Sequence, residues 1–118
     1  MKNILLLVML ILLGFGVMAQ EYHKAKFKVW GNCEMCQTKI VKAAKSVEGV
    51  KKAHWNVATL QMSVKFDKEL TTLAKIQKII AELGYDNEGY RADDVVYKNL
   101  HHCCKYERPQ PLKEEPHL

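Results

Sequence analysis

The chain has 118 residues, of which 48% are hydrophobic, 26% charged and 8% aromatic, and its formal net charge is +5. This length corresponds to one domain. Much of the apolar content lies in the first twenty residues, so the remainder is too small and too polar for a large enzyme with a deep substrate cavity. A multi-span membrane protein is excluded as well, since only one long apolar run occurs.

The first nineteen residues follow the pattern of a secretory signal peptide. Lys2 supplies a positive charge, residues 4–17 are apolar, and Val17 and Ala19 are small residues at the two positions that a signal peptidase reads. We therefore expect residues 1–19 to be removed, which places the mature protein in the periplasm or the extracellular space and outside the lipid bilayer. An uncleaved membrane anchor is the alternative, because the apolar run is only slightly shorter than a spanning helix.

Beyond this segment the spacing of apolar residues changes between a period of two, typical of strands, and a helical period. The first strand places Ala25, Phe27 and Val29 on one face. Gly49 and Gly84 follow the two helices, where a left-handed cap favours glycine. Strands are predicted over residues 24–30, 50–57, 60–67 and 85–90, and helices over residues 36–47 and 71–83.

The order β-α-β-β-α-β predicts an α+β fold of the ferredoxin-like class, in which a four-stranded antiparallel sheet carries two helices on one face. We assign residues 20–91 to this domain. RNA-recognition domains of the same topology carry stacking aromatic residues on the open face of the sheet, whereas polar residues occupy it here, and nucleic-acid binding is not expected. The residues concerned are Lys26, Lys28, Gln61, Ser63 and Lys65.

Residues 92–118 form a C-terminal extension of different composition. Asp93 and Asp94 are suited to cap a short helix, and Val96 and Leu100 give that helix a narrow apolar stripe. The stretch His101-His102-Cys103-Cys104 follows, and all three prolines come after it, which predicts a flexible tail over the last residues. The extension thus combines a short helix with a cluster of soft metal ligands.

Two cysteines, Cys33 and Cys36, lie where the first strand is followed by the first helix. Both thiols can turn toward one point, and the helix N-terminus together with Lys39 favours thiolates over thiols. Two thiolates without a third ligand suit a soft ion that accepts two-coordinate geometry, for which copper(I) is the usual biological candidate. Structural zinc(II) requires four ligands, which this loop does not contain.

With these residues the chain resembles the heavy-metal-associated domain family over residues 22–91. The resemblance implies that Cys33 and Cys36 are the metal ligands and that Tyr85 flanks the site. Family members include copper chaperones, N-terminal domains of copper-transporting P-type ATPases and a periplasmic mercuric-ion-binding protein. The segments that carry the resemblance are Cys33-Glu34-Met35-Cys36, Val47-Glu48-Gly49-Val50 and Leu83-Gly84-Tyr85-Asp86. The preceding segment, Trp30-Gly31-Asn32-Cys33, departs from the family because it lacks the methionine that is usually buried there.

Residues around the two cysteines have both a structural and a functional interpretation. Met35 is either a thioether ligand or a packing residue. Lys39 and Lys42 either steer an acidic partner toward the site or belong to a solvated helix face. The predicted flanking residues of the site are Asn32, Met35, Lys39 and Tyr85.

The cluster His101-His102-Cys103-Cys104 leaves several interpretations open. On a continuous helix Cys103 and Cys104 would point about 100° apart, whereas a chain that leaves the helix earlier could wrap all four side chains around an accessory metal ion. A disulfide and two partly buried cysteines are the alternatives. A further hypothesis is that the extension folds back and completes the site at Cys33 and Cys36.

The sequence contains no arrangement typical of a catalytic centre, and we expect a non-catalytic, exported protein that sequesters a soft ion or passes it on by thiolate exchange. Copper(I) is favoured, with mercury(II) and zinc(II) as alternatives. The expected partner is a membrane metal transporter or another thiol-bearing metal-binding domain. A thiol–disulfide exchange protein is the second candidate, although such folds use a cis-proline and no proline precedes Pro109. A passive interaction module is the third.

Overall fold

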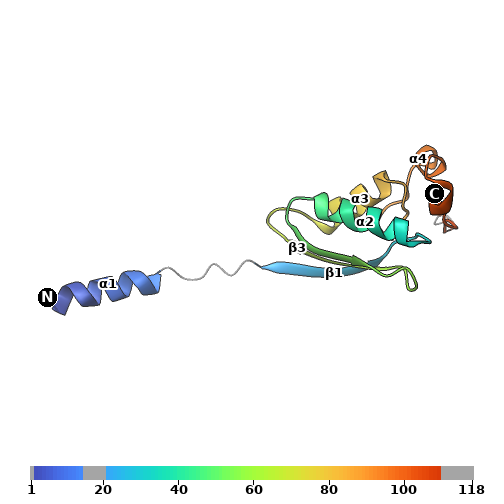
Figure 1. The fold of residues 1–118 in the computed structure, drawn as a ribbon. Coiled ribbons are helices and arrows are strands. Elements are labelled where there is room, and N and C mark those ends of the chain that lie inside the picture. Colours follow the sequence, from blue (N-terminus) through green and yellow to red (C-terminus); the bar gives the residue numbers. More distant parts are fainter. Residues whose placement is uncertain (1, 15–20, 110–118) are drawn as a thin grey trace, which may run out of the picture.

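Figure 1 shows the computed structural model, which describes residues 2–14 and 21–109. Among these residues no helix is both long and apolar enough to cross a membrane. The predicted cleavage site after Ala19 and most of the predicted flexible tail lie outside the described residues. The elements are helix α1 (Lys2–Gly14), strand β1 (Tyr22–Lys28), helix α2 (Glu34–Ser46), strands β2 (Val50–Trp55) and β3 (Gln61–Asp67), helices α3 (Leu73–Glu82) and α4 (Asp94–Lys98), and the 3₁₀ turn η1 (His102–Cys104).

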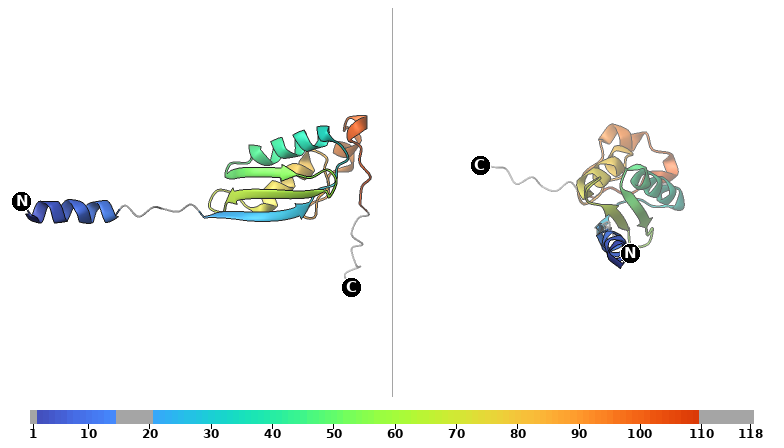
Figure 2. Two further views of the ribbon diagram at one scale, coloured as in Figure 1. Left: turned by 60° about the horizontal axis from the view of Figure 1, so that its bottom comes forward. Right: turned by 90° about the vertical axis from the view of Figure 1, so that its left-hand side faces the viewer.

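A three-stranded antiparallel sheet forms the centre of the fold, with β3 between β1 and β2. The register places Ala25 opposite Val64 and Phe27 opposite Met62, so that the apolar residues of neighbouring strands share one face. Helices α2 and α3 lie on one side of the sheet and bury this face (Figure 1, Figure 2). The predicted α+β class and the ferredoxin-like arrangement are confirmed.

The prediction of a fourth strand over residues 85–90 is wrong, because in the described chain this segment makes only one bridge, between Val29 and Asn87. Beside it the Trp30 amide donates to the Asp86 carbonyl at 2.9 Å. The chain then turns, since the side-chain oxygen of Asn87 accepts hydrogen bonds from the amides of residues 89 and 90 at 3.0 and 3.1 Å. This asparagine turn ends the pairing after one bridge.

The last residues of two predicted elements, both apolar, are exposed. Strand β2 ends at Trp55 because the side-chain oxygen of Asn56 accepts hydrogen bonds from the amides of residues 58 and 59. Val57 lies in this turn and is 39% exposed, and Leu83, just beyond α3, is 40% exposed. Both residues lie past the observed end of the element that was predicted to include them.

Trp55 at the end of β2 is fully buried and joins three segments. Its indole N–H points to the Val29 carbonyl at 3.0 Å and to the Leu60 carbonyl at 3.2 Å, which satisfies the polar end of a large apolar side chain. The ring also lies against Gly31, where an added Cβ would come within 2.9 Å of the indole Cη2 atom. The loop that carries the first cysteine pair is therefore packed directly on this ring.

The C-terminal extension packs into the same core. Helix α4 is capped by Asp93, whose side chain accepts a hydrogen bond from the Val95 amide, as predicted. After α4, residues 101–108, which we call the strap, cross the end of the domain where α2 begins (Figure 1, Figure 2). Cys104 and Tyr106 of the strap are buried in the hydrophobic core.

Asp86 anchors the strap. Its side chain is 2% exposed and accepts two hydrogen bonds from the Arg108 guanidinium, at 2.7 and 2.9 Å, and one from the Ala92 amide at 2.7 Å. The Tyr106 hydroxyl donates to the Gly84 carbonyl and accepts from the Asp86 amide, both at 2.7 Å. A buried carboxylate is tolerated in this form because its charge is paired and its oxygens are hydrogen-bonded.

Gly31→Ala is expected to lower the free energy of unfolding by about 1–3 kcal/mol, the usual cost of forcing extra volume into a packed site. The measurement is urea unfolding of the purified protein, followed by circular dichroism. Trp55→Phe is the control, since it removes the indole atoms that the new methyl group meets. In the double variant the loss of unfolding free energy should be smaller, by at least about 0.5 kcal/mol, than the sum of the losses in the two single variants. Strictly additive losses would contradict this contact.

Asp86→Asn is expected to lower the free energy of unfolding by about 3 kcal/mol, because Arg108 is left without its buried counter-charge. Asp94→Asn is the matched control: Asp94 also accepts a hydrogen bond from Arg108, at 2.6 Å, but its side chain is 74% exposed. Loss of this exposed pair should cost less than about 1 kcal/mol. Equal losses in the two variants, measured by urea unfolding, would show that Asp86 is not the anchor.

Asp86 also makes the stability of the fold depend on pH. Burial alone would raise the pKa of Asp86, but hydrogen bonds from Arg108 and the Ala92 amide, with the charges of Arg108 and Arg91, outweigh it and hold the pKa below its ordinary value. Such a carboxylate stabilises the fold above its unfolded pKa of about 3.9, and the contribution is lost as the pH falls through the lower folded value.

Between about pH 5 and about pH 2, the wild type should therefore lose more stability than Asp86→Asn, which has no carboxylate to protonate at this position. Urea unfolding at a series of pH values measures the difference. Parallel pH curves for the two proteins would argue against a lowered pKa at Asp86.

Candidate metal centre

The first cysteine pair lies in the connection from β1 to α2. Cys33 is the N-cap of α2, with an extended backbone, and Cys36 lies in the first turn of the helix. One helical turn brings the two side chains to the same side, and their Sγ atoms are 3.3 Å apart. Cys36 is fully buried, whereas Cys33 is half-buried. The pair therefore has one sulfur in the core and one at the surface.

The N-terminus of α2 provides the electrostatic environment of this pair. Unpaired amide groups at a helix start carry partial positive charge, which stabilises anions placed there. The Cys33 carbonyl accepts the first hydrogen bond of the helix, from the Gln37 amide at 3.1 Å. Sulfur anions at Cys33 and Cys36 would thus lie where the backbone favours negative charge.

The strap brings the second cysteine pair to the first. Helix α4 ends at Lys98, and η1 turns Cys103 and Cys104 toward α2. The Sγ atoms of Cys33, Cys103 and Cys104 all lie within 4.8 Å of one another. The Cys33 thiol also donates to the Cys103 carbonyl at 3.5 Å. All four cysteines are free thiols. Cys36 does not belong to this group of three, but its sulfur lies 3.3 Å from that of Cys33, so that the two pairs meet at Cys33. We call the four sulfurs together the cluster.

Three predicted flanking residues contact this cluster. The side-chain oxygen of Asn32 accepts a hydrogen bond from the Cys36 thiol at 3.3 Å, and its amide nitrogen donates to the Lys105 carbonyl at 3.4 Å. The Met35 sulfur lies 3.8 Å from the Cys103 sulfur, although Met35 itself is 46% exposed. Asn32 and Met35 therefore join the loop to the strap.

Tyr85 is the third of these residues and lies beneath the cluster. Its side chain is fully buried, and its hydroxyl, which neighbours the Cys36 and Cys104 thiols, has no hydrogen-bond partner among the described residues. Burial and the two adjacent thiols raise the pKa of Tyr85 above its ordinary range. Burial likewise raises the pKa of the Cys104 thiol. The floor of the cluster is thus shielded from solvent, with the Tyr85 hydroxyl next to two of the thiols.

Other predicted residues lie at the margin of the cluster or away from it. Lys39 is exposed and lines, together with Lys42, a depression between α2 and α3. The Nδ1 atom of His101 is 2.9 Å from the Cys103 sulfur, so this ring borders the cluster. The exposed His102 ring lies beside the His101 ring instead. In the part of the chain that the structure describes, neither histidine belongs to the group of close ligand atoms.

The residues that hold the strap in place, Tyr106 and Arg108, were missed in the sequence. Asp86 is part of the family-like segment at residues 83–86, but nothing in the spacing of charges pairs it with an arginine that lies 22 positions later. The only signal in the sequence was indirect. The extension carries a second cysteine pair, and ligands of the same kind favour a position near the first pair.

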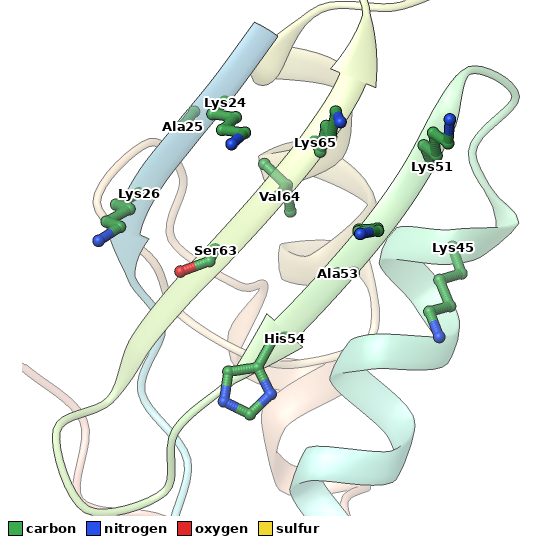
Figure 3. A pocket seen from close by; sticks show the side chains of 11 residues that line it. Lys24, Ala25, Lys26, Lys45, Lys51, Ala53, His54, Ser63, Val64 and Lys65 are labelled. Atoms are coloured by element: carbon green, nitrogen blue, oxygen red, sulfur yellow. The ribbon is translucent and has the colours of Figure 1, made fainter. Parts of the chain in front are cut away.

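The open face of the sheet carries a second feature, which Figure 3 shows from close by. Lysines from all three strands, with Lys45 from α2, surround a shallow depression of about 440 Å³, as predicted for the lysines of the first strand. The ammonium groups of Lys51 and Lys65 lie 4.6 and 5.2 Å from the centre of the Tyr22 ring. Desolvation and the charges of neighbouring lysines lower the pKa of Lys65. This face offers positive charge and no thiol.

The arrangement of the thiols fits a soft metal ion. Thiolate sulfur is the ligand type that selects copper(I), zinc(II) and similar ions, and four sulfurs converge here from two segments. Metal–sulfur bonds of about 2.3 Å place tetrahedral sulfur ligands about 3.8 Å apart. The separation of 3.3 Å between the Cys33 and Cys36 sulfurs is shorter than this value, and the sulfurs of Cys33, Cys103 and Cys104 lie within 4.8 Å of one another.

A model of the heavy-metal-associated domain matches residues 32–86. Among solved structures, oxidized MerP from Ralstonia metallidurans CH34 is 32% identical, with 58% of this chain and 96% of that chain covered and a TM-score of 0.55. The CopZ metallochaperone is 26% identical, with 55% and 98% covered and a TM-score of 0.54. The N-terminal soluble domains of Bacillus subtilis CopA are 36% identical, with 58% and 47% covered and a TM-score of 0.55. No curated protein gives a significant match.

The matched range begins one residue before Cys33 and ends just after Tyr85, so it contains the first cysteine pair and the floor of the cluster. The strap, with Cys103 and Cys104, lies outside it. MerP is covered over nearly its whole length at an identity of 32%, and the antiparallel sheet with two helices on one face agrees with this likeness. The chain belongs to the heavy-metal-associated domain family.

Proposed function

We propose that this chain is an exported, non-catalytic protein that binds a soft metal ion at Cys33 and Cys36 and either sequesters it or passes it on. The observation that carries the proposal is the position of the two sulfurs, 3.3 Å apart at the N-terminus of α2. The likeness to a protein named as a metallochaperone and to domains of CopA supports it. Export is supported by the signal-like residues 1–19.

Copper(I) is the favoured cargo, with mercury(II) and zinc(II) as alternatives. A pair of thiolates meets the two-coordinate geometry that copper(I) accepts. Mercury(II) is a soft ion as well, and thiolate sulfur suits it. Zinc(II) requires more ligands than the first pair offers, so on Cys33 and Cys36 alone it is the weakest of the three.

The unequal exposure of the two cysteines supports transfer by ligand exchange. Cys33 is half-buried at the surface, whereas Cys36 is fully buried. An incoming thiolate would reach the ion from the side of Cys33 and displace that sulfur first, while Cys36 keeps the ion until the partner's second ligand arrives. The partner is accordingly a membrane metal transporter or another domain with exposed thiols, and no free ion is released.

Thiol–disulfide exchange is the second candidate. The specific observation in its favour is again the separation of 3.3 Å between the Cys33 and Cys36 sulfurs, because only a small movement is needed to reach the roughly 2.05 Å of a disulfide. The two functions differ in their requirement for metal. Reduction of insulin by the metal-free protein would identify the exchange reaction.

The test is a titration of the reduced protein with copper(I) under anaerobic conditions, in competition with a coloured copper(I) chelator. We expect tight uptake by the wild type. Cys33→Ser/Cys36→Ser should weaken it by more than the roughly 100-fold that the loss of an outer contact to a metal site costs. His54→Gln, a change on the exposed side of β2, is the control and should bind like the wild type.

Two results would contradict the proposal. One is a wild type that takes up none of copper(I), mercury(II) and zinc(II) when it is folded and reduced. The other is a Cys33→Ser/Cys36→Ser variant that binds as tightly as the wild type. A metal-free wild type that reduces insulin, and fails to bind metal, would instead identify the exchange protein.

A further inference from the structure

The family range ends at residue 86, yet the cluster of thiols extends beyond it. We propose that Cys103 and Cys104 of the strap join Cys33 and Cys36 as ligands, so that one ion is held by four sulfurs. This inference rests on the proposed function, because it keeps the first pair as ligands and adds to it. Each thiol loses its proton to solvent as its sulfur binds the ion.

The positions of the sulfurs carry the first step. Three of them, from Cys33, Cys103 and Cys104, lie within 4.8 Å of one another, and Cys36 lies 3.3 Å from Cys33. Tetrahedral ligands at about 2.3 Å from an ion are about 3.8 Å apart. Three sulfurs are therefore already close to the spacing that a shared ion requires, and Cys36, which lies outside this group of three, is held beside one of them.

Tyr85 provides a second observation, independent of the sulfur distances. Its buried hydroxyl neighbours Cys36 and Cys104, but among the described residues no group lies in hydrogen-bond geometry to it, and such orphaned groups are rare in proteins. Thiolates are better acceptors than thiols, and a charged acceptor strengthens a hydrogen bond. Sulfurs that bind a metal as anions would thus supply the partner that this hydroxyl lacks.

The strap is already held in its closed position by contacts that involve no sulfur. Tyr106 and Arg108 bind the backbone and side chain of Asp86, and the Asn32 amide donates to the Lys105 carbonyl. Most of the ordering cost of bringing Cys104 to the site is therefore met by the fold itself, which is the condition under which added ligands increase affinity.

Two consequences follow for the cargo. Four sulfurs in tetrahedral arrangement are typical of zinc(II) and chemically similar divalent ions, so the strap extends the range of ions beyond copper(I). The Cys103 carbonyl also lies against the Cys33 thiol, at 3.5 Å. A partner that attacks from this side must first displace the strap, and release of the ion is slowed accordingly.

The test uses cadmium(II), whose bonds to sulfur give a charge-transfer absorption that grows with the number of thiolates bound. Cys103→Ser/Cys104→Ser should show about half of the wild-type absorption per bound ion and an affinity lower by roughly 100-fold or more. His102→Ala is the matched control, because it changes an exposed neighbour in the same turn, and it should behave like the wild type. Full wild-type absorption and affinity in the double serine variant would overturn the inference.

Because Cys104 is buried, a second measurement uses the wild type alone. The folded protein is treated with iodoacetamide with and without cadmium(II), and mass spectrometry identifies the cysteines that cadmium(II) protects. The readable thiols are the half-buried Cys33 and Cys103, because Cys36 and Cys104 are fully buried and react slowly in either state. Protection of Cys103 together with Cys33 supports the inference. Protection of Cys33 without Cys103 overturns it and leaves the proposed function intact, whereas the absence of any cadmium(II), mercury(II) or copper(I) uptake removes both.

Tyr106→Phe separates the ligands from the strap that carries them. It keeps all four sulfurs but removes the two hydrogen bonds of the Tyr106 hydroxyl. At saturation its absorption per cadmium(II) should equal that of the wild type, while release of the ion to EDTA should be about tenfold faster. Release at the wild-type rate would show that the strap does not control access to the site.

Discussion

The buried carboxylate of Asp86 is the contact on which the shape of the site depends. It accepts hydrogen bonds from the Arg108 guanidinium and the Ala92 amide, and so fixes the start of the extension and the end of the strap to the segment that was predicted to be a fourth strand. Because the neighbouring Asn87 turns the chain away after a single bridge, this end of the sheet is left to the strap. Tyr106 fills that position in the core and brings Cys104 with it.

The other half of the site is positioned by Trp55. The usual methionine of the family is missing from the loop before Cys33, and an indole that bonds to the Val29 and Leu60 carbonyls packs beneath Gly31 instead. One large side chain thus does two things: it closes the core at the end of β2 and supports the loop from below. The two cysteine pairs meet because two buried anchors, one for each, lie at the same end of the sheet.

Most of the fold could be predicted from the period of apolar residues, because a strand or helix with one buried face shows a periodic apolar pattern within its own sequence. The fourth strand could not, since the side chain of Asn87 offers its own backbone an alternative to pairing. The first cysteine pair was recognisable from spacing alone. The meeting of Cys33 with Cys103 could only be a hypothesis, because seventy residues separate them and the contacts that enforce it, Asp86 with Arg108 above all, leave no pattern in the sequence.

Cys36 and Cys104 belong to the same packed interior as Ile40, Ile76 and Tyr85. This interior must open locally before a protease can cut the chain there. An ion held by sulfurs from both the start of α2 and the strap stabilises only the folded arrangement in which these segments are in contact. With one ion on all four sulfurs, as inferred above, a molecule that has delivered its cargo opens more readily than one that carries it. The lifetime of the protein in its compartment would then follow the supply of metal, without a separate sensor.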